Sequence, residues 1–125
     1  SSAATYPLYQ KIRDIVMSID DTLEESPRQN YLSYKFGKTN VIALWPKDGW
    51  IEVVLNAKLG TIKDNNGMIY DISNRKWSAA QYAFKFFDDT DVDAAKNLIA
   101  STAIIIISTA ATAITGRLLP LRGAA

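Results

Sequence analysis

The first pattern along the chain is that of an amphipathic helix over residues 7–23. Its apolar positions recur at spacings of four, three and four residues, so they share one helical face. These positions are Leu8, Ile12, Ile15 and Ile19. Pro7 suits the first turn, where its missing N–H has no helical partner to lose. Pro27 marks the end of this region, because a proline disfavours helical geometry at the residue before it.

Alternation of apolar and polar residues then predicts three short strands. They are expected over residues 31–36, 41–45 and 50–55. The first and third have one apolar side each, whereas the second is apolar on both faces, as a central strand is. The sequences Gly37-Lys38 and Pro46-Lys47-Asp48-Gly49 between them are typical of turns. Together these features predict an antiparallel meander.

Two further strand signals follow the meander. Asp64-Asn65-Asn66-Gly67 predicts a hairpin that joins a short strand at residues 61–63 to another at residues 68–72. Residues 82–87 alternate again and predict the last strand.

A second helix is expected to begin near Thr90. Thr90 and Asp93, three residues later, form a pair similar to a capping box. The complete pattern predicts an α+β fold with an N-terminal helix, a mostly antiparallel sheet of about five strands and a C-terminal helix. Both helices are expected to pack on the same face of the sheet.

The C-terminal stretch is long, apolar and uncharged over residues 98–116. Its length permits a transmembrane helix. Seven of these residues are Ser, Thr or Gly, which offsets most of the gain from the isoleucines, so no membrane span is favoured. Continuation of the second helix and an irregular tail are the two expected forms. We treat residues 1–125 as a single domain, with a core at about 6–103 and an apolar extension at 104–125.

The residue repertoire at the ends of the chain is narrow. From residue 98 onward only Leu, Ile, Ala, Ser, Thr, Gly, Arg and Pro occur, and residues 104–107 are four consecutive isoleucines. Such a run is unusual in a helix, because β-branching restricts the side-chain rotamers. A further interpretation is therefore that the termini depart from the true gene sequence, and no functional residue is assigned there.

Composition excludes several kinds of chemistry. The chain of 125 residues is long enough for one core, and its net charge is +1. Cysteine is absent, which excludes disulfides, thiolate zinc sites and a thiol nucleophile. Histidine is absent too, which removes the commonest general base and metal ligand. No signal-peptide pattern begins the sequence, so we expect a cytoplasmic protein that uses no cofactor.

The acidic run at residues 88–93 is the strongest candidate for cation chemistry. Carboxylates at alternate positions suit Ca²⁺ or Mg²⁺, and a metal-assisted enzyme would require Asp88, Asp89 and Asp91 to converge. The run lacks the glycine and the bidentate glutamate of an EF-hand, and helix capping explains it without an ion. The six glycines form no phosphate-cradling loop. We therefore predict a protein that is not an enzyme, with no catalytic residue and no metal site.

Basic and aromatic residues are interleaved through the predicted sheet. Residues 28–77 hold eight basic and four acidic residues, a net charge of +4, whereas residues 1–27 hold two and five, a net charge of −3. Several single-strand-binding folds use cations and aromatic rings on a sheet to hold phosphates and stack bases. The candidate binding residues are Lys35, Lys38, Lys47, Arg75 and Lys76 for charge, and Trp50 and Trp77 for stacking. The alternative is that the lysines keep the sheet edges soluble and the aromatic residues belong to the core.

Three short motifs resemble the DUF5655 family, a group of uncharacterised small bacterial domains sometimes labelled "predicted transport protein". Tyr31-Leu32-Ser33-Tyr34-Lys35 is similar to that family's Tyr-hydrophobic-small-aromatic-Lys strand. Tyr70-Asp71-Ile72-Ser73 is similar to its Arg-Asp-Val-Ser turn, and residues 92–99 are similar to its closing helix. The resemblance covers about residues 8–103. Such domains occur alone or beside nuclease and restriction modules, so the resemblance implies an accessory role in binding nucleic acid or protein.

The sequence departs from that family at two places. Tyr70 stands where the family usually has a basic residue, and residues 75–80 replace a glycine-rich segment. Three functional hypotheses remain. The leading one is a non-catalytic binding module whose sheet contacts nucleic acid or a nuclease partner. The second is a protein-interaction domain or homodimer, with Trp50, Val54 and residues 104–107 as its contact patch. The third is a metal-assisted enzyme that uses residues 88–93.

Overall fold

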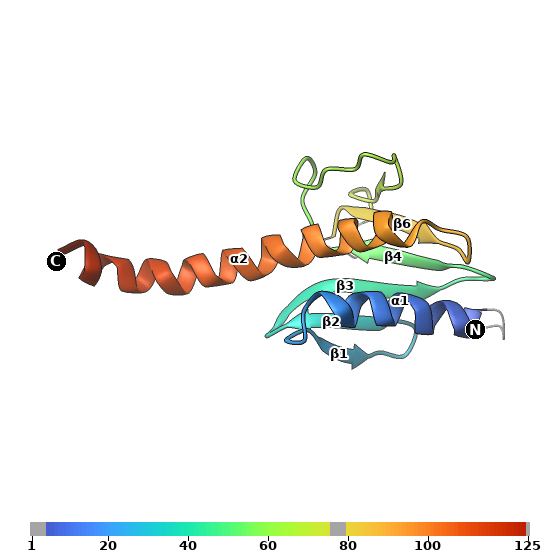
Figure 1. Cartoon of the computed structure of the whole chain (residues 1–125), viewed down its shortest axis with the longest axis horizontal. Coiled ribbons are helices and arrows are strands. Elements are labelled where there is room, and N and C mark those ends of the chain that lie inside the picture. The colour runs from blue at the N-terminus through green and yellow to red at the C-terminus, as the bar shows by residue number, and fades with distance from the viewer. Residues whose placement is uncertain (1–4, 76–79, 125) are drawn as a thin grey trace.

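The structure, a computed structural model, describes residues 5–75 and 80–124, with side chains as far as Ala111. It consists of two helices and six strands (Figure 1). In chain order these are α1 (Thr5–Ile19), β1 (Glu24–Pro27), β2 (Leu32–Phe36), β3 (Thr39–Pro46), β4 (Ile51–Leu55), β5 (Tyr70–Asp71), β6 (Tyr82–Phe86) and α2 (Val92–Ala124). The predicted α+β class and the order helix, antiparallel sheet, helix are confirmed.

The six strands form one sheet in the order β1-β2-β3-β4-β6-β5, and every neighbouring pair is antiparallel. The meander predicted for β2, β3 and β4 is confirmed. Gly49, in the turn between β3 and β4, has a φ of 82°, a conformation that glycine adopts without a steric penalty. β6 lies between β4 and β5, so the last strand in the chain is an interior strand of the sheet.

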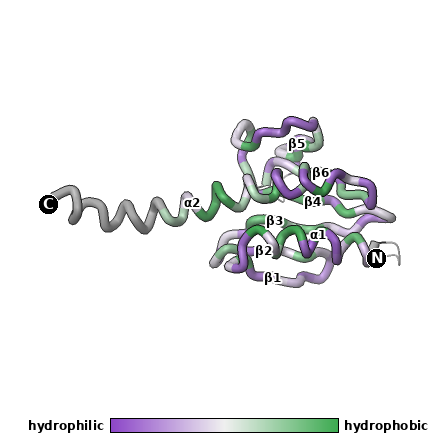
Figure 2. The backbone as a smooth tube through the Cα atoms, in the orientation of Figure 1, coloured by the Kyte–Doolittle hydropathy of each residue, from purple (hydrophilic) through white to green (hydrophobic). Residues whose placement is uncertain are grey.

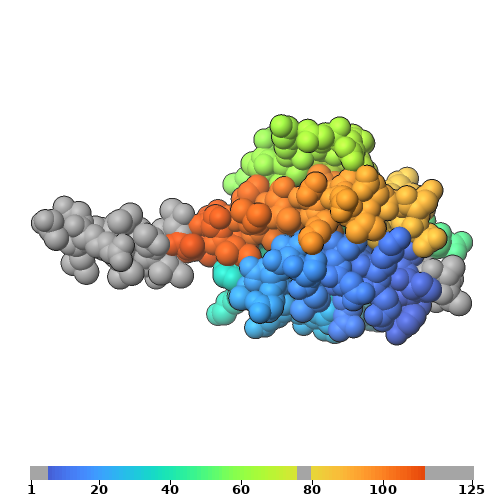
Figure 3. Space-filling model, viewed as in Figure 1, coloured from blue at the N-terminus to red at the C-terminus, as the bar shows by residue number. Residues whose placement is uncertain are grey.

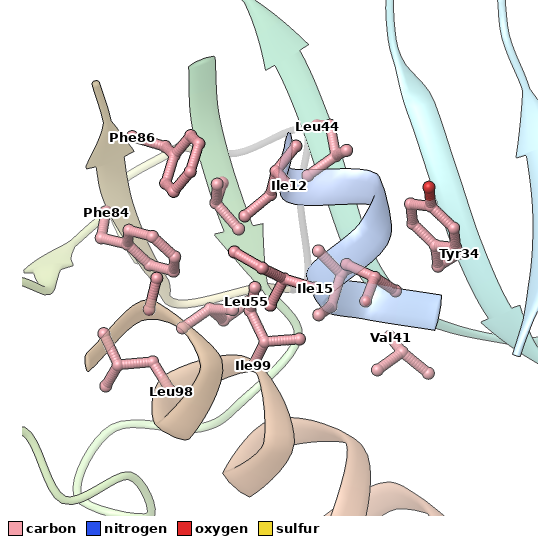
Figure 4. Packing of buried hydrophobic residues seen from close by; sticks show 14 of the residues in the cluster. Ile12, Ile15, Tyr34, Val41, Leu44, Leu55, Phe84, Phe86, Leu98 and Ile99 are labelled. Carbon is pink, nitrogen blue, oxygen red and sulfur yellow. The ribbon is translucent and has the colours of Figure 1, made fainter. Parts of the chain in front are cut away.

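Both helices cover the same face of the sheet, as predicted. They lie side by side on the surface that Figure 3 shows. Ile12 of α1 and Ile99 of α2 are fully buried, and they meet Phe84 and Phe86 of β6 in one core (Figure 4). Burial of each such side chain contributes about 1.5–3 kcal/mol. The period of α1 and the alternation of the strands are therefore the sequence features that create this core.

The region between β4 and β6 differs from the prediction. No strand occurs at residues 61–63, and β5 pairs with β6 rather than with a hairpin partner. The Asp64 carboxylate accepts a hydrogen bond from the Ile69 N–H at 2.8 Å, which closes the segment into a loop. Ile62 turns inward and is only 7% exposed, so it packs in the core and does not continue a strand. The predicted hairpin is therefore wrong.

The segment after α1 also differs from the prediction. α1 ends at Ile19, four residues early, because the Asp20 side chain accepts a hydrogen bond from the Thr22 N–H at 2.8 Å. The chain then forms β1, an edge strand that the sequence pattern did not predict. Glu25 of β1 accepts hydrogen bonds from Arg13 of α1 and from the Tyr34 hydroxyl. These polar contacts hold this short, charged strand at the edge of the sheet.

The start of α2 is capped by a different residue from the one predicted. Asp91 precedes the helix and accepts a hydrogen bond from the Ala94 N–H at 3.1 Å, as an N-cap residue does. Thr90 instead accepts a hydrogen bond from the Phe87 N–H at 2.8 Å within the preceding turn. The capping explanation of the acidic run holds, but the cap is Asp91.

The C-terminal stretch continues α2 as one helix to Ala124, the first of the two expected forms. Figures 1 and 2 show α2 crossing the sheet and then leaving it. Ala103 is fully buried, whereas Ile104 is 59% exposed and Ile105 is 37% exposed. Among the described residues, one segment, Val92–Ala111, is long and apolar enough to cross a membrane by length and composition, and 28% of it is buried against the rest of the chain.

Candidate nucleic-acid interface

The helices leave the second face of the sheet uncovered, and we call it the helix-free face. Alternate strand residues point to it, because neighbouring residues in a strand face opposite sides. The register brings Trp45 of β3, Glu52 of β4 and Lys85 of β6 into one row across this face. A second row contains Ala43, Val54 and Ala83, and Ile72 and Ala80 pack over it in a second, smaller buried cluster. The face therefore combines aromatic and charged side chains with a patch that the segment around β5 covers.

Glu52 is the most unusual residue of the helix-free face, because it is charged and only 5% exposed. Arg75 donates two hydrogen bonds to its carboxylate, from Nη1 to Oε1 at 2.8 Å and from Nη2 to Oε2 at 3.0 Å. The Tyr70 hydroxyl donates a third hydrogen bond, to Oε2 at 2.5 Å. A paired carboxylate of this kind avoids the cost of burying an isolated charge. Glu52 thus connects β4 to the segment around β5.

The partners of Glu52 determine its protonation. Burial acts to raise the pKa of Glu52, but the hydrogen bonds from Arg75 and Tyr70 and the positive charges of Arg75 and Lys47 outweigh it and hold the pKa below its ordinary value. Burial and the nearby Glu52 carboxylate raise the pKa of the Tyr70 hydroxyl. Near neutral pH the carboxylate is therefore ionised and the phenol protonated, and no proton is poised for general acid–base catalysis.

A cleft of about 550 Å³, the cationic cleft, lies next to Glu52, and three cations line it. Its lining residues are Lys47, Trp50, Glu52, Tyr70, Arg75 and Lys85. Three cations and one carboxylate give this cleft a net charge of +2. The Lys85 ammonium lies 5.2 Å from the centroid of the Trp50 ring, and Phe87 stacks on the same indole with a centroid distance of 5.8 Å. The cleft can therefore attract an anion and offer it an aromatic surface.

A second cavity, the Tyr31–Trp45 pocket, lies on the helix-free face. It has no charged residue among its described lining residues. Its volume is about 330 Å³. The rings of Tyr31 and Trp45 stack with their centroids 4.2 Å apart and form part of its wall. Asn40 and Asn56 also line it, together with the buried hydroxyl of Ser33. The pocket is thus suited to an uncharged, flat group.

The structure divides the predicted binding residues into separate groups. Lys47, Trp50 and Arg75 lie together in the cationic cleft. Lys35 and Lys38 lie at the other end of β3, near the turn between β2 and β3. Nine residues of extended chain from Lys38 to Lys47 span about 30 Å.

Two predicted residues cannot be placed. Lys76 and Trp77 lie outside the residues that the structure describes.

Three residues of the cleft, Lys85, Glu52 and Tyr70, were not predicted as binding residues from the sequence. Lys85 is the one charged residue in the predicted strand 82–87, but its position opposite Glu52 depends on the β4–β6 register. Glu52 gave one detectable signal, since it is a charged residue between the apolar residues Ile51 and Val53. The pairing of Glu52 with Arg75 is a long-range contact that no local pattern predicts.

The other hypotheses find less support in the geometry. In residues 5–75 and 80–124, no group of three or more acidic side chains lies together as a metal site would require. Trp50 and Val54 belong to the helix-free face, whereas Ile104 to Ile107 belong to α2 on the other side of the sheet, where Ile106 and Ile107 pack against the main core. These residues therefore do not form the single contact patch that the second hypothesis required.

Comparison with known proteins gives no relative for this chain: no family model matches it, and neither the curated proteins nor the solved structures contain a significant match. The geometry of the helix-free face is therefore the basis for assigning a function.

Proposed function

We propose that this protein is a non-catalytic module that binds single-stranded nucleic acid across the helix-free face of its sheet. The observation that carries this proposal is that Lys47, Arg75 and Lys85 line one cleft together with Trp50, with the Lys85 ammonium over the indole ring. Cations track a phosphate backbone, and aromatic rings stack on bases without regard to their sequence.

The net charge of the cleft favours an anionic ligand such as a phosphate group. Arg75 already holds Glu52 in a bidentate pair, so it has a fixed position, while Lys47 and Lys85 are exposed. A phosphate in the cleft would contact these lysines and gain from the net charge of +2. No step of this role requires a proton transfer or a metal ion.

The test is a titration of a fluorescently labelled single-stranded oligonucleotide and of its duplex at low and moderate salt. We expect the single strand to bind more tightly, and its affinity to fall as salt rises. The double variant Lys47→Ala/Lys85→Ala should reduce the affinity at least tenfold. It should also make the salt dependence shallower, by about 0.7 in the log–log slope for each phosphate that the protein no longer neutralises.

The matched control is Lys58→Ala/Lys63→Ala, which removes the same charge from the exposed loop between β4 and β5. This variant should bind nearly as well as the unchanged protein. Absence of single-strand binding at low salt, or an equal loss in both double variants, would show that the cationic cleft is not a nucleic-acid site.

The second candidate function is protein interaction or self-association through α2. The observation that favours it is the exposure of Ile104 and Ile105, which are apolar and lie next to the buried part of the helix. Exposed apolar surface of this kind marks interaction sites when it is contiguous. Binding through these residues would be insensitive to salt, in contrast to binding in the cationic cleft.

A further inference from the structure

We propose that the Tyr31–Trp45 pocket holds one nucleobase of the bound strand, and that the side-chain amides of Asn40 and Asn56 contact the edge of that base. This inference rests on the proposed function, because it assumes that a single strand crosses the helix-free face. It adds a site for the base to the site for the phosphates.

The two cavities differ in charge. The described lining of the Tyr31–Trp45 pocket is uncharged, whereas the cationic cleft carries a net charge of +2. A nucleotide has the same division, since its base is neutral and aromatic and its phosphate is anionic. The volume of about 330 Å³ lies within the range of small-molecule pockets, about 300–1,000 Å³.

Two side-chain amides at the pocket are held in place by hydrogen bonds. The Ser33 hydroxyl donates to Asn40 Oδ1 at 3.1 Å, and Asn56 Nδ2 donates to the Asn40 backbone carbonyl at 2.6 Å. These bonds fix both amide groups in orientation. Each amide has further hydrogen-bonding capacity, because an amide nitrogen carries two N–H donors and its oxygen has two lone pairs. A nucleobase edge presents donors and acceptors side by side, which amide side chains match.

The two cavities adjoin. Trp45 lines the pocket and lies directly opposite Glu52, which lines the cationic cleft. Neighbouring strands are about 4.8 Å apart, so a strand that places a base in the pocket brings its phosphates close to the cleft. Tyr31 and Trp45 stack on each other, so the base would lie against the outer surface of this ring pair while Lys47 contacts a phosphate.

The test compares a single-stranded oligonucleotide with an abasic strand of the same length, which keeps the phosphates and lacks the bases. We expect the abasic strand to bind the unchanged protein about tenfold more weakly, in accord with the usual size of base–aromatic stacking. Ala43→Leu places a larger side chain in the pocket and should abolish most of this difference. Ala111→Leu, the same substitution on the exposed side of α2, should preserve it.

A second pocket variant and an unfolding measurement distinguish loss of the pocket from loss of the fold. Tyr31→Leu removes one aromatic wall, and urea unfolding of both pocket variants shows whether either one remains folded. The inference is supported if a folded pocket variant loses most of the difference in affinity between the two strands and keeps its salt dependence.

Three results would overturn the inference, and they are distinguishable. Equal, salt-dependent binding of both strands by the unchanged protein would eliminate the base pocket and base stacking on Trp50, and would leave only phosphate binding in the cationic cleft. Folded pocket variants that retain the full difference between the strands would eliminate the base pocket and leave the proposed function intact. Absence of binding by either strand at low salt would eliminate the proposed function and the base pocket together.

Discussion

Glu52 joins two parts of the helix-free face through its hydrogen bonds. Its carboxylate holds Arg75 and Tyr70, which come from a segment that contributes only the two-residue strand β5 to the sheet. A second group of the same three residue types, Arg13, Glu25 and Tyr34, joins α1 to β1. In both groups a glutamate receives hydrogen bonds from an arginine and a tyrosine, so each edge of the sheet is held by one such group.

The Glu52 group gives a prediction for stability as a function of pH. The folded-state pKa of Glu52 is below its unfolded value, so its contribution is fully present above a pH of about 4.5 and is lost as pH falls through the folded-state pKa. Glu52→Gln keeps the shape but removes the charge, and it should lower the free energy of unfolding by about 1–3 kcal/mol at pH 7. Urea unfolding from pH 2 to pH 7 should show the difference between the two proteins shrinking in acid.

The control for this experiment is Asp48→Asn in the turn between β3 and β4, an exposed position. It should leave the free energy of unfolding nearly unchanged at all these pH values. A Glu52→Gln protein as stable as the unchanged protein at pH 7 would contradict the stabilising role of the pair. At the alkaline end the sign is opposite. The raised pKa of Tyr70 gives a contribution that is present below pH 10 and is lost as pH rises further.

At the scale of elements, the acidic run at residues 88–93 stabilises the start of α2 through the N-cap residue Asp91. Asp91→Ala removes the side-chain acceptor of the Ala94 N–H and should lower the free energy of unfolding by about 0.5–2 kcal/mol. Asp91→Asn should retain most of the stability, because asparagine is an equally good N-cap residue. Thermal or urea unfolding measures both. Asp89→Ala is the control, and an equal loss in that variant would indicate a general charge effect in place of capping.

The elements that the sequence predicts well are those with a strong period. The stripe of α1 and the alternation in β2, β4 and β6 depend on local burial; the three strands occur within a residue of their predicted bounds, and α1 occurs as predicted except that it ends four residues early. The sequence pattern did not predict β1, because its residues are polar. The strand is held in the sheet by Arg13 of α1 and Tyr34 of β2, which lie on other elements. β5 was misassigned because its partner is β6, not the nearer segment at residues 61–63.

The candidate site was only partly predictable for the same reason. Trp50, Lys47 and Arg75 carry an obvious chemical signal, and the structure brings them together. Lys35 and Lys38 carry the same signal, but β3 separates them from the cleft. Charge and aromatic content can thus be counted in a sequence, whereas which cations share a cleft depends on strand register and order.

At the scale of the whole molecule, α2 has two different surroundings along its length. Its first part is buried against the sheet and α1, while Ile104 and Ile105 are exposed where it leaves them. We expect these residues to promote self-association at high protein concentration. Sedimentation velocity should show a sedimentation coefficient that rises with concentration for the unchanged chain and stays constant for Ile104→Ser/Ile105→Ser. Ala111→Ser is the control, and identical behaviour of all three proteins would contradict this expectation.

The position of β6 between β4 and β5 has a consequence for the order of folding. β5 leaves the ribosome before β6, and the strand with which it pairs is β6. β5 and β6 are joined by the short connection from Asp71 to Tyr82, whereas the pairing of β4 with β6 closes the longer loop between Ile51 and Phe86 and therefore costs more chain entropy. The cationic cleft takes Glu52 from β4 and Lys85 from β6, so it cannot assemble before that longer loop has closed.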